Sequence, residues 1–345
     1  MSLADLLGSE LPIIQAPMAG SQGSELALAV ARSGACGSLP CATLDRDGLT
    51  RELTRIARDS ARPINLNFFC HHVSEPDPAR DEAWRKALSP YYREYAIDTA
   101  GSAPPANRAP FSAEVAALVA PFRPRIVSFH FGLPSAELLA QVKSWGSKVL
   151  SSATTVEEAR WLEAQGVDAI IAQGLEAGGH RGMFLSEDVT SQVGLFALLP
   201  QIVSAVRVPV IAAGGIADER AVAAALRLGA QGVQVGTAYL FCPEASTTRV
   251  HRAALASTAA QHTALTNLFS GRPARGIVNR LMRELGAISD LPPTFPQASQ
   301  AIAPLRARAE SQDSGDFSPL WSGQSASLCR ERPAEELTRL LSRGL

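Results

Sequence analysis

The sequence is poor in cysteine, in net charge and in long apolar runs. Its five cysteines are odd in number and show no Cys-x-x-Cys spacing, so a disulfide framework and a zinc site are both disfavoured. Lys and Arg total 32 and Asp and Glu total 33, which gives a formal net charge of −1. A protein that wraps nucleic acid or sits on an anionic membrane needs a basic face, and this balance disfavours both classes.

Membrane-directed segments and common catalytic motifs are also absent from the sequence. No run of about 18 apolar residues occurs, and the start, MSLADLLGSELP, lacks the cationic and apolar regions of a signal peptide. The six histidines show no His-x-His or His-Glu-x-x-His spacing, and there is neither a P-loop nor a Gly-x-Ser-x-Gly elbow. We therefore expect a cytoplasmic protein with no metal and no nucleic-acid or membrane partner.

The chain contains a regular alternation of short apolar segments and amphipathic helical segments. Hydrophobic residues make up 46% of it and charged residues 19%, enough for a large core. Strands that are apolar on both faces belong in a parallel sheet covered by helices. The predicted strands span 12–14, 35–39, 63–69, 125–129, 148–151, 168–172, 209–213 and 232–235. Eight such alternations predict an α/β fold, a (β/α)₈ TIM barrel.

Three segments are predicted along the chain. The barrel spans residues 1–240 and is interrupted by a long excursion over 71–111, which we expect to be a lid or an active-site insertion. Residues 241–310 are predicted to form a smaller, mostly helical domain on the substrate side of the barrel mouth. Residues 311–345 are predicted to pack back on the barrel.

Glycines follow the last two predicted strands. Gly214 and Gly215 come after strand seven, and Gly236 and Thr237 come after strand eight. Exposed backbone N–H groups at these two strand ends form a common phosphate site in TIM barrels. Two tight turns would explain the glycines without any ligand, and the phosphate could belong to a substrate or to FMN.

Neutral amides and two histidines also fall at predicted strand ends. Asn67, Gln173 and Gln234 could bond the polar edge of a flat heterocycle, although each alone could be a buried, satisfied side chain. His180 lies within the Gly-rich segment QGLEAGGHRG and is a candidate base or hydrogen-bond donor. His130 is a candidate substrate contact or a hydrogen-bonded wall residue, and Glu176 is a candidate cap for a backbone N–H.

Together these segments resemble a known family. QAPMAG, NLNFF, SFHFG, QGLEAGGHRG, AAGGI and QVGT are similar to segments of the class I nitronate monooxygenases, as is LWSGQSASL at 320–328. The resemblance covers about residues 12–240. It implies an FMN-containing TIM barrel that oxidises alkyl nitronates, including propionate 3-nitronate, with O₂ to a carbonyl compound and nitrite, in a detoxifying role.

The resemblance also implies a set of site residues. His180 matches the active-site histidine, and His130 is expected to contact substrate. The cofactor contacts that it implies are Met18 and Gly20 against the flavin ring, Asn67 and Gln173 at its polar edge, Gly178 close to the flavin, Gly215 at the phosphate, and Gln234, Val235, Gly236 and Thr237 at phosphate and ring.

Two flavin reductases and a non-enzymatic protein remain as alternatives. An FMN-dependent enoyl-acyl-carrier-protein reductase is similar in EAGGH, AAGGIAD and VQVGT, and an NAD(P)H:quinone reductase would use the same barrel. A catalytically silent flavin-binding protein is the third alternative. Consumption of NADH would favour a reductase, whereas O₂ uptake driven by nitronate alone would favour the monooxygenase. The sequence leaves open a monomer or a homodimer.

Overall fold

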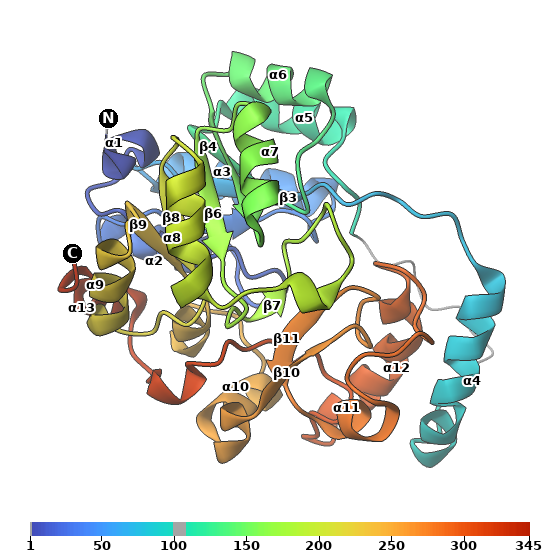
Figure 1. Ribbon diagram of the computed structural model, residues 1–345. Coiled ribbons are helices and arrows are strands. Elements are labelled where there is room, and N and C mark those ends of the chain that lie inside the picture. Colours follow the sequence, from blue (N-terminus) through green and yellow to red (C-terminus); the bar gives the residue numbers. More distant parts are fainter. Residues whose placement is uncertain (1, 99–107) are drawn as a thin grey trace.

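The computed structural model describes residues 2–98 and 108–345, and its centre is an eight-stranded parallel barrel (Figure 1). The strands lie around the barrel in the order β1-β9-β8-β6-β5-β4-β3-β2. Their bounds are β1 (Ile13–Gln15), β2 (Ser38–Pro40), β3 (Asn65–Phe69), β4 (Ile126–His130), β5 (Lys148–Ala153), β6 (Ala169–Gln173), β8 (Val210–Ala213) and β9 (Gly232–Val235). The predicted barrel is therefore confirmed, and each predicted strand overlaps an observed one.

Cys36 closes the barrel between its first two strands. Its backbone N–H donates to the carbonyl of Ile13 at 2.8 Å, and its carbonyl accepts from the N–H of Gln15 at 2.9 Å. This single bridge lies just before β2, so the sheet is nearly closed without a long β1–β2 ladder.

Helices cover the outside of the barrel because each presents an apolar stripe to the strands. Side-chain caps fix where they begin: Thr155 accepts from the N–H of Glu158 at α7, and Asp218 accepts from that of Ala221 at α9. The surrounding elements are α2 (Ser24–Arg32), α3 (Arg46–Asp59), α5 (Ala113–Val119), η1 (Ala120–Phe122), α6 (Ala136–Ser144), α7 (Val156–Ala164), η2 (Val189–Ser191), α8 (Leu195–Ala205), α9 (Glu219–Arg227) and η3 (Thr237–Phe241).

The amino-terminal helix closes one end of the barrel. In α1 (Leu3–Leu7), Leu3, Leu6 and Leu7 are buried in one cluster with inward-facing strand residues such as Leu150 and Ile211. This plug fills the end at which the strands begin. Only the opposite end, where the strands finish, is left for a ligand, as in other barrels of this kind.

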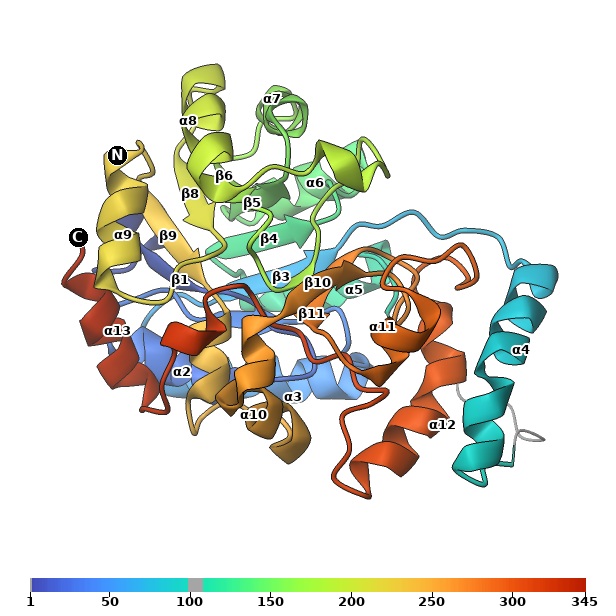
Figure 2. The ribbon, with the colours of Figure 1, turned by 60° about the horizontal axis from the view of Figure 1, so that its bottom comes forward.

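The excursion after β3 extends well away from the barrel. Its helix α4 (Pro78–Glu94) lies beside α12 (Ala298–Glu310) in both ribbon views (Figures 1 and 2). The indole N–H of Trp84 donates to the carbonyl of Ala298 at 3.2 Å, and the Tyr92 hydroxyl donates to that of Ala301 at 2.5 Å. Part of the predicted excursion, residues 99–107, lies outside the described residues.

The segment predicted as a helical domain contains a small sheet as well as helices. It includes α10 (Arg249–Ala256), η4 (Thr258–Gln261), α11 (Arg280–Leu285) and α12, together with β10 (Thr263–Thr266) and β11 (Ala274–Ile277). The sequence analysis did not predict these strands. β11 pairs antiparallel with β7 (Gly179–His180), which leaves the barrel after β6. The sheet therefore joins this segment to the histidine loop.

The carboxyl-terminal segment returns to the barrel. It contains η5 (Ala326–Leu328) and α13 (Ala334–Ser342), and α13 lies against α2 and α9 (Figure 2). The buried hydroxyls of Tyr239 in η3 and Thr338 in α13 bond at 2.8 Å and join these two elements. Among the described residues, no helix is both long and apolar enough to cross a membrane.

Candidate active site

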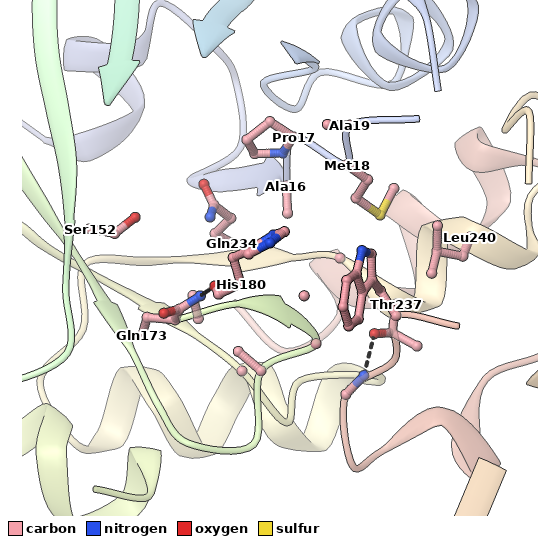
Figure 3. Close-up of a pocket in the computed structure, with 18 of the residues that line it drawn as sticks. Ala16, Pro17, Met18, Ala19, Ser152, Gln173, His180, Gln234, Thr237 and Leu240 are labelled. Atoms are coloured by element: carbon pink, nitrogen blue, oxygen red, sulfur yellow. Dashed lines mark hydrogen bonds between the residues drawn. The ribbon is translucent and has the colours of Figure 1, made fainter. Parts of the chain in front are cut away.

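A large cavity opens at the carboxyl ends of the strands (Figure 3). Its empty volume is ≈ 1400 Å³ with the open solvent at its mouth included. The loops after β1, β6, β8 and β9 line it, together with β3 and β4. The tail residues Trp321, Gly323 and Ser325 line it from the other side.

Most of the predicted site residues meet in this cavity. Those that line it are Met18, Asn67, His130, Gln173, Gly178, His180, Gly215, Gln234, Gly236 and Thr237. Gly20 and Val235 are not among the lining residues. Gly20 lies on the exposed turn after β1, and Val235 is buried in the core between barrel and helices because strand side chains alternate in direction. The contacts of Gly20 and Val235 with the cofactor therefore stay predictions.

The two predicted glycine turns form one side of the cavity. Gly215 has a φ of +71°, a left-handed conformation that glycine adopts without strain. The backbone N–H groups of Gly215 and Gly236 donate to no other described residue. Thr237 begins η3, whose first N–H groups also lack intrahelical partners. Free N–H groups from two adjacent loops make this wall suited to an anion.

Two amides face the cavity with unused hydrogen-bonding capacity. Oε1 of Gln234 is buried without a hydrogen-bond partner, a costly state for a polar atom unless a ligand completes it. Asn67 donates through Nδ2 to the hydroxyl of Ser128 at 2.9 Å, whereas its Oδ1 has no bond within the described chain. Both unused atoms are amide oxygens, so they suit a ligand whose polar edge carries an N–H or O–H donor.

Gln173 instead shapes the loop that carries His180. Its Nε2 donates to the carbonyl of His180 at 3.0 Å, and its Oε1 accepts from the N–H of Gly182 at 2.7 Å. The fully buried Arg181 donates to the carbonyls of Gln173 and Gly174 at 2.8 and 2.7 Å. The predicted cap is also present, since Glu176 accepts from the N–H of Leu195 at the start of α8.

His180 lines the cavity, and one of its ring nitrogens contacts a residue outside the cavity. Its Nε2 is 2.8 Å from the hydroxyl of Ser270, and Nδ1 has no partner within the described chain. Burial, followed by the positive charges of Arg108 and the neighbouring histidine and arginine side chains, holds the pKa of His180 well below its usual 6.5. The imidazole is therefore neutral at physiological pH and can accept a proton.

His130 uses both ring nitrogens within the chain. Nε2 lies 3.2 Å from the carbonyl of His180 and must donate to it, so Nδ1 accepts from the hydroxyl of Ser152 at 3.0 Å. Burial lowers the pKa of His130 to about 4. This bonding favours the wall alternative, in which His130 supports the His180 loop, and leaves it only its ring edge to offer a substrate.

Three residues in or behind the cavity are not marked by the strand pattern of the sequence. Arg108 lines the cavity from the end of the excursion, Trp321 lines it from the tail, and Ser270 supports His180 from the turn between β10 and β11. All three lie outside the barrel's strand ends, so the periodicity that located the other residues does not reach them. The Gly-Gln segment at 320–328, which contains Trp321, is the one part of the sequence that indicates a role for the tail.

Metal and thiol chemistry have little support here. Within residues 2–98 and 108–345, no group of three or more His, Cys, Asp or Glu side chains is arranged to hold a metal ion. Burial raises the pKa of the Cys70 thiol well above 9.0, which disfavours a reactive thiolate near the site.

The chain was compared with a family profile, with curated proteins and with solved structures. The family profile described as Nitronate monooxygenase matches residues 1–344. A protein named Nitronate monooxygenase from Paraburkholderia phytofirmans is 42% identical over 352 residues, covering 100% of this chain and 94% of its own. One of the same name from Pseudomonas aeruginosa is 41% identical over 344 residues, covering 97% and 96%. The crystal structure of a nitroalkane oxidase from Streptomyces ansochromogenes has a TM-score of 0.90 at 37% identity, covering 100% and 98%.

Proposed function

The chain belongs to the nitronate monooxygenase family of flavin-dependent oxidoreductases, and from that premise we propose its cofactor, its co-substrate and the roles of its residues. The resemblance predicted from the sequence is thereby confirmed. The proposed reaction is the FMN-dependent oxidation of a small alkyl nitronate, such as propionate 3-nitronate, by O₂ to a carbonyl compound and nitrite. The family match disfavours the two reductases that the sequence left open.

One observation carries the choice of FMN. A single cavity contains both free backbone N–H groups at Gly215 and Gly236 and the unpartnered amide oxygen of Gln234. The N–H groups suit a phosphate, and the amides of Gln234 and Asn67 suit the polar edge of an isoalloxazine ring. Inorganic phosphate alone would satisfy the first set and leave the second without a partner.

The remaining cofactor contacts follow from the cavity lining. Met18 would lie against the ring, Gly178 would let the backbone approach it, and Thr237 would contribute to the phosphate wall. Gln173 would act mainly by holding the His180 loop, since its amide already makes two bonds there. When bound, FMN supplies the electron-accepting ring that nitronate oxidation requires.

The chain's own part in the chemistry is to hold an anionic substrate and to move a proton. A nitronate is already deprotonated at carbon, so positioning is its main need. We assign His180 to the nitro group, with the cation of Arg108 lining the same cavity. For a neutral nitroalkane, Nδ1 of His180 would take the α-proton, because the lowered pKa leaves the ring unprotonated at neutral pH. Trp321 and the tail would limit access of water.

The purified protein tests this assignment directly. We expect it to hold FMN, to consume O₂ when given a nitronate without NADH, and to release nitrite. The variant His180→Asn should retain FMN while turnover of a neutral nitroalkane falls about 10²- to 10⁴-fold, the usual range for a positioned acid–base group. Rapid flavin reduction by NADH, or turnover by His180→Asn equal to that of the parent, would contradict the proposal.

Location and assembly stay predictions. The five cysteines are all unpaired in the structure, and we propose a cytoplasmic protein acting as a monomer or a homodimer on a small substrate.

A further inference from the structure

Ser270 supports His180 from outside the cavity. It lies in the turn between β10 and β11, and β11 pairs with the short strand that carries His180. The serine is 1% exposed, and its Oγ is 2.8 Å from Nε2 of the imidazole. The contact therefore joins the carboxyl-terminal half of the chain to the side chain that faces the substrate.

The hydroxyl of Ser270 has one proton to donate and lies close to both His180 and Arg272. Ser270 Oγ accepts from the N–H of Arg272 at 3.4 Å and donates to the carbonyl of the same residue at 3.3 Å. A hydroxyl has one proton and two acceptor positions. An arrangement in which that proton bonds the carbonyl makes Nε2–H of His180 the donor to Ser270 Oγ at 2.8 Å. A neutral imidazole that carries its proton on Nε2 has its lone pair on Nδ1.

We propose that Ser270 is a positioning residue that holds His180 in the Nε2–H tautomer and so leaves Nδ1 as the basic atom of the cavity. The inference rests on the proposed function and refines it. With a neutral nitroalkane, the α-carbon–hydrogen bond breaks, the proton forms a bond to Nδ1, and the electron pair delocalises into the nitro group to give the nitronate. The resulting imidazolium keeps its Nε2–H bond to Ser270, so nothing behind the ring has to rearrange.

The surroundings of His180 make this support necessary. The charged and titratable groups that act on the ring are Arg108, Arg272, His130 and His71, and each disfavours a positive imidazolium. No carboxylate lies among the described residues that line the cavity. The Ser270 hydroxyl is therefore the neutral acceptor that stabilises the protonated ring.

Two substrates distinguish a positioning role of Ser270 from a general loss of structure at the site. Neutral nitroethane needs the proton transfer, whereas preformed ethyl nitronate does not. In Ser270→Ala, we expect kcat/KM for nitroethane to fall about 10- to 100-fold. The value for the nitronate should change by less than about 3-fold. Ser270→Thr keeps the hydroxyl and should restore most of the loss with nitroethane. Equal losses with both substrates, or no loss with either, would overturn the inference.

The tautomer can be observed without turnover. In protein labelled with ¹⁵N-histidine and free of substrate, we expect the His180 signals to show a protonated Nε2 and a bare Nδ1, assigned by their disappearance in His180→Asn. The Ser270→Ala variant should show a mixture of tautomers. A bare Nε2 in the parent protein would refute the inference even if the enzyme is active. Failure of the parent to oxidise either substrate would instead refute the proposed function.

Discussion

Arg108 supplies the positive charge at the wall of the cavity. Its guanidinium makes no hydrogen bond with any described residue, and its carbon Cζ lies 5.9 Å from the ring centre of Phe295. Burial, followed by the charge of Arg306, lowers the pKa of Arg108, which still leaves an arginine charged. An unpaired, partly buried cation needs an anion, and a nitronate provides one.

We therefore expect Arg108→Gln to weaken substrate binding more than turnover. A hydrogen bond to a charged group is worth about 1.5–3 kcal/mol, so KM for a nitronate should rise about 10- to 100-fold while kcat changes little. Steady-state kinetics would measure this. Arg85→Gln removes the same charge from an exposed position on α4 and is the matched control. An unchanged KM in Arg108→Gln would show that the charge does not act on substrate.

At the level of elements, local patterns located the barrel strands and the helices between them. Each predicted strand is mostly apolar, and most of its residues are buried, so burial and period agree. The same reasoning missed β7, β10 and β11. Gly179 and His180 form a strand only because Ala274 and Arg275 pair with them from far along the chain. Pairing of that kind is a tertiary effect that no short window of sequence contains.

The site residues also divide into those that local sequence predicts and those that depend on tertiary structure. Gln234 and Thr237 were predictable because the end of a parallel strand fixes where they lie. Arg108 and Ser270 were not, because their positions depend on how the excursion and the small sheet fold over the barrel mouth. For Gln173 and His130 the position was predicted, but the bonds that engage their side chains within the chain were not.

The contact between the β6 loop and the tail has a testable steric requirement. A Cβ at Gly178 would lie 2.5 Å from the backbone nitrogen of Gly323, which no real contact tolerates. Gly323 in turn donates to the Thr237 hydroxyl at 2.9 Å, beside the proposed phosphate wall.

We therefore expect Gly178→Ala to push the tail outward and to weaken retention of FMN by at least about 10-fold, through loss of packing and of about one hydrogen bond. Flavin fluorescence during dialysis would measure it. Gly23→Ala has room for its Cβ at 3.4 Å or more from Glu52 and lies away from the cavity, so it is the control. Equal FMN retention in both variants would argue against the tail as part of the cofactor site.

For the molecule as a whole, buried histidines link folding to pH. Burial lowers the pKa of His71, His130 and His251 to about 4, and that of His180 lies well below 6.5. The unfolded chain takes up these protons near pH 6.5, whereas the folded chain resists them until about pH 4. Stability from these groups is therefore complete above pH 6.5 and is lost progressively as the pH falls from there towards 4.

His251 offers the cleanest test of this linkage, because the structure gives its imidazole a single bond, from Nε2 to the carbonyl of Trp321 at 2.9 Å. Gln at this position can keep an N–H donor while removing the titration. We expect urea unfolding of the parent to show a free energy that falls between about pH 6.5 and 4, with about 1.4 kcal/mol per pH unit from each such group. His251→Gln should flatten that slope by one group's share, while His262→Gln, an exposed histidine, should leave it unchanged. If the free energy of unfolding falls equally steeply with pH in the parent and in both variants, the acid sensitivity comes from carboxylates. The buried imidazoles would then have the same pKa in the folded and the unfolded chain.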